Sequence, residues 1–164
     1  MRSVEELKIL RQAILNEVEG RQFYDSAAQR AEDDSVKEAF VHLAREERQH
    51  EVWLRKMYEQ VAENKTLAFE EMELIEVLSP QIFRLENIGA ESGSLEISVY
   101  KIGILMERAS GIFYRNGADA ATTPAVKKLL LQLAEWEDVH LESLQKIYDL
   151  LREEWWDKQG FSPA

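Results

Sequence analysis

Two stretches decide the fold: ILNEVEGRQFYDSAAQRAEDDSVKEAFVHLAREERQHEVWLRKMYEQ at residues 14–60 and ILMERASGIFYRNGADAATTPAVKKLLLQLAEWEDVHLESLQKIYDL at residues 104–150. The second repeats the first at a constant offset of 90 residues, and 16 of the 47 aligned positions are identical. Each copy holds a glutamate and, 30 residues later, a Glu-x-x-His pattern. One glutamate plus Glu-x-x-His from each of two helix pairs is the ligand set of a two-metal carboxylate bundle. The candidate metal ligands are Glu17, Glu47, His50, Glu107, Glu137 and His140.

Apolar residues recur in alternating steps of three and four along four long segments. This spacing is the stripe that a bundle helix turns toward its neighbours. The links at about residues 32–34 and 121–123 are short, and short links join antiparallel neighbours. The sequence therefore predicts an all-α fold, an antiparallel four-helix bundle of two helical hairpins with a long crossover connection. We expect the bundle at residues 1–154, with helix pairs at about 4–62 and 94–152, a crossover at 63–93 and a C-terminal tail at 155–164.

Local signals predict where the helices begin. Ser3 stands three residues before Glu6, and Ser35 also precedes a glutamate by three residues, which is the capping-box pattern of a helix start. The third helix is expected to begin near Ser94. The fourth carries Pro124 where the first helical turn is expected, a position that suits proline.

Composition excludes several classes of function. The chain has 164 residues, enough for one domain with a substantial core. It has no cysteine, so disulfides, thiolate ligands and iron–sulfur clusters are excluded. The net charge of −11 argues against nucleic-acid binding, which needs a basic surface. Because neither a secretory signal nor a run of 18 apolar residues is evident, we expect a soluble, cytoplasmic protein with no membrane contact.

The chain has 24 glutamates, and the four candidate ligands differ from the others in where they lie on their helices. Most glutamates flank the apolar stripes, whereas the four candidates lie on them. An ionised carboxylate in a bundle core costs several kcal/mol unless it is paired. Two divalent metal ions would neutralise four carboxylates, and residues i and i+3 of Glu-x-x-His reach one site from a shared helix face. Carboxylate and imidazole ligands favour iron or manganese, with zinc also compatible.

An ordinary bundle offers a different explanation, in which these residues are solvated or paired with basic side chains. A single Glu-x-x-His favours that explanation, because glutamate is common in this chain. The doubled set, on the stripes and at a fixed offset, favours the metal site. Arg21 is the one basic residue found on a stripe, so few cations are available to offset the buried charge.

Several aromatic and histidine side chains have two explanations each. Tyr24 and Tyr114 follow a ligand glutamate by seven residues, and they are the candidates for a supporting catalytic role. Their hydroxyls would bond either to a ligand carboxylate or to backbone. Trp53 and Trp136 would either pack peripherally or limit solvent access to the site, and His42, off its stripe, is predicted to lie on the surface.

The motifs resemble those of the rubrerythrin branch of the ferritin-like superfamily, over roughly residues 5–152. The resemblance implies a ferritin-like bundle with two iron ions. It also implies that Glu17 and Glu107 are ligands from the first and third helices, that Glu47 and Glu137 bridge the metals, and that His50 and His140 are terminal ligands. The residues that carry the resemblance are Glu17-Val18-Glu19-Gly20, Phe23-Tyr24, Leu43-Ala44, Glu47-Arg48-Gln49-His50 and their counterparts in the second copy.

Two departures from that family pattern bear on function. Rubrerythrins proper carry a rubredoxin-like part with four cysteines, and this chain has no cysteine. We therefore expect electrons to come from an external donor protein. The family also has an extra glutamate one turn after the third-helix ligand, where this chain has Ser110. The predicted site is thus more symmetric than the site of those relatives.

The resemblance implies an oxidoreductase that reduces hydrogen peroxide or dioxygen, with a role in oxidative stress. The alternative is a non-catalytic or ferroxidase-type protein that binds or stores iron. A metal-stabilised bundle that only binds partners is a third interpretation, and a substrate hydroxylase would use the same ligands. We expect a homodimer, to which the aromatic pair Trp155-Trp156 would contribute a contact.

Overall fold

The structure is a computed structural model that describes residues 2–63 and 95–160. The described residues fold into helices joined by short turns, and the predicted all-α bundle is confirmed. The helices are α1 (Arg2–Arg30), α2 (Asp34–Glu63), α4 (Leu95–Ala120) and α5 (Pro124–Lys158).

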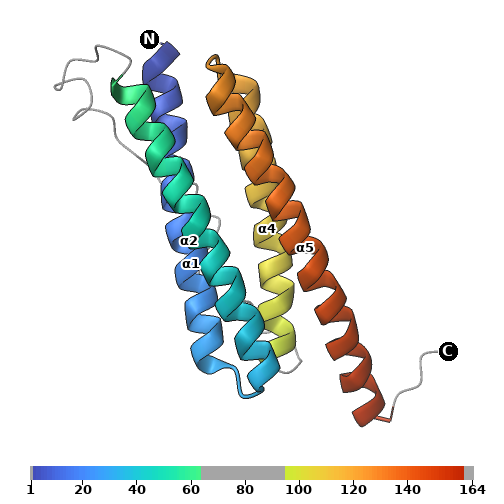
Figure 1. Cartoon of the computed structure of the whole chain (residues 1–164). Coiled ribbons are helices and arrows are strands. Elements are labelled where there is room, and N and C mark those ends of the chain that lie inside the picture. Colours follow the sequence, from blue (N-terminus) through green and yellow to red (C-terminus); the bar gives the residue numbers. More distant parts are fainter. Residues whose placement is uncertain (1, 64–94, 161–164) are drawn as a thin grey trace.

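The helices pair as two hairpins, α1 with α2 and α4 with α5, that lie side by side (Figure 1). Each hairpin is antiparallel, whereas α2 and α4 run in the same direction along the bundle (Figure 1). The end of α2 and the beginning of α4 therefore lie at opposite ends of the bundle. Apart from Glu63, which closes α2, the crossover predicted at residues 63–93 lies outside the described residues.

The cap of α2 differs from the predicted one. The backbone N–H groups of Ser35 and Val36 donate to the Asp33 carboxylate at 2.8 and 3.1 Å, and the Ser35 hydroxyl donates to the same oxygen. Asp33 is thus the residue that caps the helix, and Ser35 lies inside its first turn. A carboxylate accepts both backbone donors at once, which is why it takes the position that the capping-box pattern assigned to serine.

A side chain of α1 accepts hydrogen bonds from the two residues that precede α5. Thr123 precedes the helix with extended backbone, and Pro124 occupies the first turn, as predicted. The buried Glu6 carboxylate of α1 accepts from the backbone N–H and hydroxyl of Thr122 at 2.6 and 3.0 Å. It also accepts from the backbone N–H and hydroxyl of Thr123 at 2.5 and 2.8 Å. Glu6 therefore joins the two hairpins, a role that its place in a capping-box pattern did not predict.

Glu6→Ala is expected to lower the free energy of unfolding by about 2–4 kcal/mol, because it leaves four donors at a helix start without their charged acceptor. Glu6→Gln keeps one oxygen and should cost less. The measurement is denaturant unfolding of the metal-free protein. Glu5→Ala, at an exposed neighbouring position, is the matched control; equal small losses in all three variants would contradict the role of Glu6.

The C-terminal boundary also differs from the prediction. α5 continues to Lys158, so Trp155 and Trp156 are helical and do not begin a tail at residue 155. The two rings make an edge-on contact with centroids 4.9 Å apart. Among the described helices, none has the length and apolar character needed to cross a membrane.

Within the four described helices, the core consists of two apolar clusters at opposite ends of the bundle. One cluster contains Leu7 and Leu10 of α1 with Leu130 of α5. The other contains Phe40 of α2 and Tyr100 of α4. The middle of the bundle, between these clusters, is the level at which the candidate ligands lie.

Candidate metal centre

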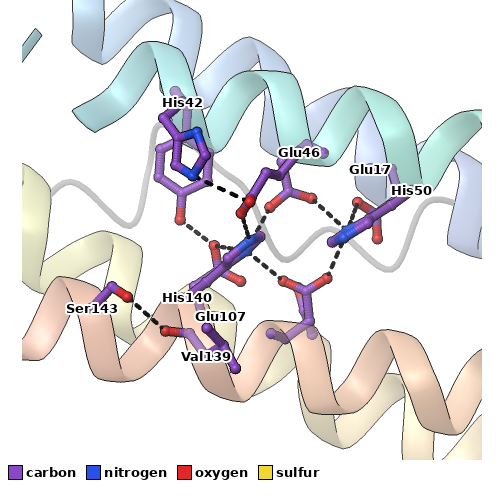
Figure 2. Close-up of polar contacts among 12 residues, drawn as sticks. Glu17, His42, Glu46, His50, Glu107, Val139, His140 and Ser143 are labelled. Carbon is purple, nitrogen blue, oxygen red and sulfur yellow. Dashed lines mark hydrogen bonds and ion pairs between the residues drawn. The ribbon is translucent and has the colours of Figure 1, made fainter. Parts of the chain in front are cut away.

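The structure brings all six predicted ligands together in the middle of the bundle. Each helix contributes to the group, and α2 and α5 contribute a glutamate and a histidine each (Figure 2). All six residues are at most 4% exposed. The local reason is the helical spacing: i and i+3 of each Glu-x-x-His turn to the same interior face. The residues in this group are Glu17, Glu47, His50, Glu107, Glu137 and His140.

The group divides into two overlapping sets of four. One set is Glu17, Glu47, His50 and Glu137, and the other replaces Glu17 and His50 with Glu107 and His140. Within each set, one ligand atom from every residue lies within 4.8 Å of the others. Glu47 and Glu137 belong to both sets, which is the geometry of two carboxylates shared between neighbouring metal positions.

The atoms that face the centre are chemically suited to metal ions. Several carboxylate oxygens at the centre are buried and make no hydrogen bond with any described residue: Glu47 Oε1, Glu107 Oε2 and both Glu137 oxygens. A buried acceptor without a partner costs free energy that a bound cation would recover. The donor set therefore fits two hard or borderline divalent ions such as iron, manganese or zinc.

The four buried glutamates fall into two pairs according to the direction in which their pKa values are shifted. Burial, with the nearby charges of Glu47 and Glu137, raises the pKa of Glu17 well above its usual range. Burial and Glu137 do the same to the pKa of Glu107. Burial would also raise the pKa of Glu47 and Glu137, but the protonated groups close to them, both histidines included, lower both values. Without metal, the two shared glutamates are therefore the ionised ones.

The histidines supply the compensating positive charge. Burial alone would lower the pKa of each imidazole, but contacts with the surrounding carboxylates raise it, to about 12 for His50. The raised pKa values favour the imidazolium form of both histidines, which would place two positive charges opposite the two shared carboxylates and make the metal-free group neutral overall. Arg21 takes no part, since it lies partly exposed with its Nε 3.7 Å from Glu51 Oε2.

The two tyrosines bond to ligand carboxylates, and each reaches across to the other hairpin. The Tyr24 hydroxyl donates to Glu107 Oε1, and the Tyr114 hydroxyl donates to Glu17 Oε1. Burial raises the pKa of both phenols well above the usual value, so both stay protonated and act as donors. Of the two explanations offered by the sequence, the bond to a carboxylate is confirmed; each tyrosine contacts the glutamate of the opposite copy.

Tyr24→Phe and Tyr114→Phe should each destabilise the metal-free protein by about 1–3 kcal/mol, because each leaves a buried carboxyl oxygen without its donor. Denaturant unfolding measures the change. Tyr58→Phe, at a half-buried tyrosine away from the group, should cost little. Equal stability of all three variants would show that the hydroxyl bonds contribute nothing.

Asn16 and Ser110 add a polar contact that exists in one half of the site. The buried Asn16 amide donates to the Ser110 hydroxyl at 3.0 Å and to the Tyr114 hydroxyl at 3.2 Å. The position equivalent to Asn16 in the second copy is Met106, which has no such donor. Comparison of the two copies could have found Asn16, because a polar residue aligned with an apolar one breaks the repeat.

The two candidate ligand histidines differ in the other side chains that contact their rings. His140 Nε2 lies 2.5 Å from Glu46 Oε2, a residue that sequence reasoning missed (Figure 2). That hydrogen bond lowers the pKa of Glu46. His42, exposed as predicted, lies 3.2 Å from the other Glu46 oxygen. Trp53 and Trp136 stack with centroids 4.6 Å apart, and Trp136 stacks on His50 at 5.1 Å.

A pocket of about 220 Å³ opens over the two imidazole rings. The histidine Nδ1 atoms point toward the carboxylates, since each lies 3.3–3.7 Å from carboxylate oxygens of the group. The pocket therefore meets the backs of the rings, and the imidazoles separate it from the centre. Its other lining residues are Glu46, Gln49, Trp53, Trp136 and Val139.

Comparisons with known proteins agree with this architecture. A solved structure of a hypothetical protein from Pyrococcus furiosus is similar to the chain, with a TM-score of 0.70 and 27% identity over 90% of both chains. A comparison with curated proteins gives no match. The family model described as Rubrerythrin matches residues 8–148, a range that contains all six candidate ligands. The chain belongs to the rubrerythrin family.

Proposed function

We propose that this protein binds two iron ions and reduces hydrogen peroxide or dioxygen with electrons from an external donor. The observation that supports the proposal most strongly is the pair of overlapping four-residue sets that share Glu47 and Glu137 inside the bundle. Membership of the rubrerythrin family implies the same pair of metal ions. When bound, two ferrous ions would supply the two electrons that convert one peroxide and two protons into two waters.

The residues of the chain have separate roles in this proposal. Glu17 and His50 would hold one ion, and Glu107 and His140 the other, with the shared glutamates between them. The Tyr24 hydroxyl keeps its proton on Oη and donates to Glu107, which restrains how that carboxylate turns. The surrounding apolar clusters exclude bulk water from the centre, so only small oxidants are expected to reach it.

An anaerobic ferrous titration followed by a peroxide pulse tests the proposal. We expect about two irons per chain and oxidation of both by one equivalent of peroxide, followed by re-reduction by an added one-electron donor. Uptake of many irons per chain would contradict the redox role in favour of storage. Two bound irons that peroxide and dioxygen leave reduced would favour a metal that serves stability alone.

Metal binding is expected to release about four protons per chain near neutral pH. The reason is the raised pKa of Glu17, Glu107, His50 and His140: all four carry a proton in the metal-free protein and must lose it to bind an ion. The apparent affinity should therefore rise with pH. Calorimetric titration with ferrous ion in two buffers of different ionisation heat counts the protons, and a release of none would contradict the neutral metal-free site.

A further inference from the structure

The two histidines are equivalent in the repeat and present the same atom to the centre. His50 Nδ1 lies 3.3 Å from Glu17 Oε2 and 3.4 Å from Glu137 Oε1. His140 Nδ1 lies 3.3 Å from both Glu47 Oε1 and Glu137 Oε2. Nδ1 is thus the nitrogen that faces the centre on each side, which leaves Nε2 of each ring for contacts with other side chains.

Behind His140, a carboxylate meets Nε2. Glu46 comes from α2, in the opposite hairpin, and its Oε2 lies 2.5 Å from His140 Nε2. Its other oxygen lies 3.2 Å from His42 Nε2, so the carboxylate is held from both sides (Figure 2). A carboxylate on the remote nitrogen of a metal-binding histidine fixes the tautomer and the ring orientation and makes the ligand nitrogen more basic.

On the His50 side, the residue at the equivalent position of the repeat is a tryptophan, and its indole lies against the face of the imidazole ring. Trp136 aligns with Glu46 at the 90-residue offset, and its ring stacks on the His50 ring with centroids 5.1 Å apart and planes inclined by 12°. Trp53 stacks on Trp136 in turn. Within residues 2–63 and 95–160, no side chain makes a hydrogen bond or ion pair with His50 Nε2. Stacking orients the ring but supplies no negative charge.

We infer that the two metal positions are unequal. The position formed by Glu107 and His140 binds a divalent cation more tightly and fills first, because the Glu46 carboxylate contacts His140 Nε2 whereas Trp136 only stacks on the face of the His50 ring. Loss of such an outer carboxylate typically weakens metal binding by about 10–100-fold, which sets the expected separation between the two binding steps. This inference rests on the proposed two-metal site and adds the order in which its halves fill.

The test is an anaerobic calorimetric titration of the metal-free protein with Co²⁺ as the probe. The wild-type protein should bind two ions in steps that differ by about 10–100-fold in affinity. Glu46→Gln should weaken the first step by a similar factor and bring the two steps together. Trp136→Glu, which places a carboxylate at the equivalent position behind His50, should strengthen the second step.

Glu38→Gln is the matched control, since it removes one charge from an exposed position of the same helix. A crystal grown with one equivalent of Co²⁺ identifies the first position by anomalous scattering, and the peak should lie next to His140. Two equal steps that Glu46→Gln leaves unchanged, or a first peak next to His50, would overturn the inference and leave the two-metal site standing. A folded protein that binds no Co²⁺ and no Fe²⁺ would remove both.

Discussion

The double variant Glu47→Ala, Glu137→Ala is expected to lose binding of both metal ions. These two carboxylates belong to both ligand sets, so their removal leaves one glutamate and one histidine for each ion. It also removes the two negative charges that stay ionised in the metal-free site. The loss of affinity should exceed the roughly 10–100-fold effect of losing an outer partner, because these residues are ligands themselves.

Metal content after anaerobic loading with ferrous ion and gel filtration measures this effect. The wild-type protein should retain about two ions, as expected for a site of this ligand set, and the double variant about none. The control is Glu38→Ala, Glu142→Ala, which removes the same charge from exposed positions of the same two helices. Circular dichroism shows whether each variant is folded. A folded double variant that still holds two ions would place the metals elsewhere.

Metal should also raise the thermal stability of the protein by a large amount. A ligand at a free concentration 100 times its Kd adds about 2.7 kcal/mol per site, so two sites add about 5 kcal/mol. For a domain of this length, about 1 kcal/mol corresponds to 2–4 °C, which gives a rise in Tm of roughly 10–20 °C. The gain arises because the ligands converge only in the folded bundle.

Differential scanning calorimetry with and without Mn²⁺ under reducing conditions checks this prediction, and a chelator should reverse the rise. The Glu47→Ala, Glu137→Ala variant should melt at the same temperature in both conditions. A wild-type Tm that does not respond to metal, or a variant that responds equally, would contradict a stabilising site in the core.

The repeat made the fold, and the grouping of the six candidate ligands, predictable. Helical spacing alone determines which side of a helix Glu137 and His140 occupy, and the repeated pattern shows that two hairpins present the same face. When the apolar faces of the two hairpins pack together, the candidate ligands of one hairpin are therefore expected to face those of the other. Helix boundaries were less predictable, since Asp33 and not Ser35 caps α2, and α5 continues through Trp155 and Trp156. Those outcomes depend on local competition between several good donors, acceptors and helix formers.

The contacts between hairpins could not be read from spacing along one helix. Tyr24 follows Glu17 by two turns, yet its hydroxyl bonds to Glu107, because the register of α1 against α4 sets which carboxylate it reaches. Glu46 flanks the ligand Glu47 and looks like one of many exposed acids, yet it lies against His140 of the opposite hairpin. Such partners follow from how two helices are placed against each other, and periodicity does not specify that placement.

The departures from exact repetition carry information about function. Asn16 aligns with Met106, and Glu46 aligns with Trp136. Asn16 bonds to Tyr114, which contacts Glu17, whereas Glu46 and Trp136 contact His140 and His50. The surroundings of the two proposed metal positions therefore differ although their candidate ligands are the same. The inference that one metal position fills before the other rests on this difference between the residues that surround the two sets of candidate ligands.

Anomalous diffraction from crystals loaded anaerobically with excess ferrous ion tests the central claim most directly. The predicted result is two iron peaks in the middle of the bundle, about 3.5–4 Å apart as in other two-metal sites, with Glu47 and Glu137 between them. His50 should lie against one peak and His140 against the other. Well-ordered crystals with no peak among these six side chains, or with iron only at surface carboxylates, would contradict the two-metal site.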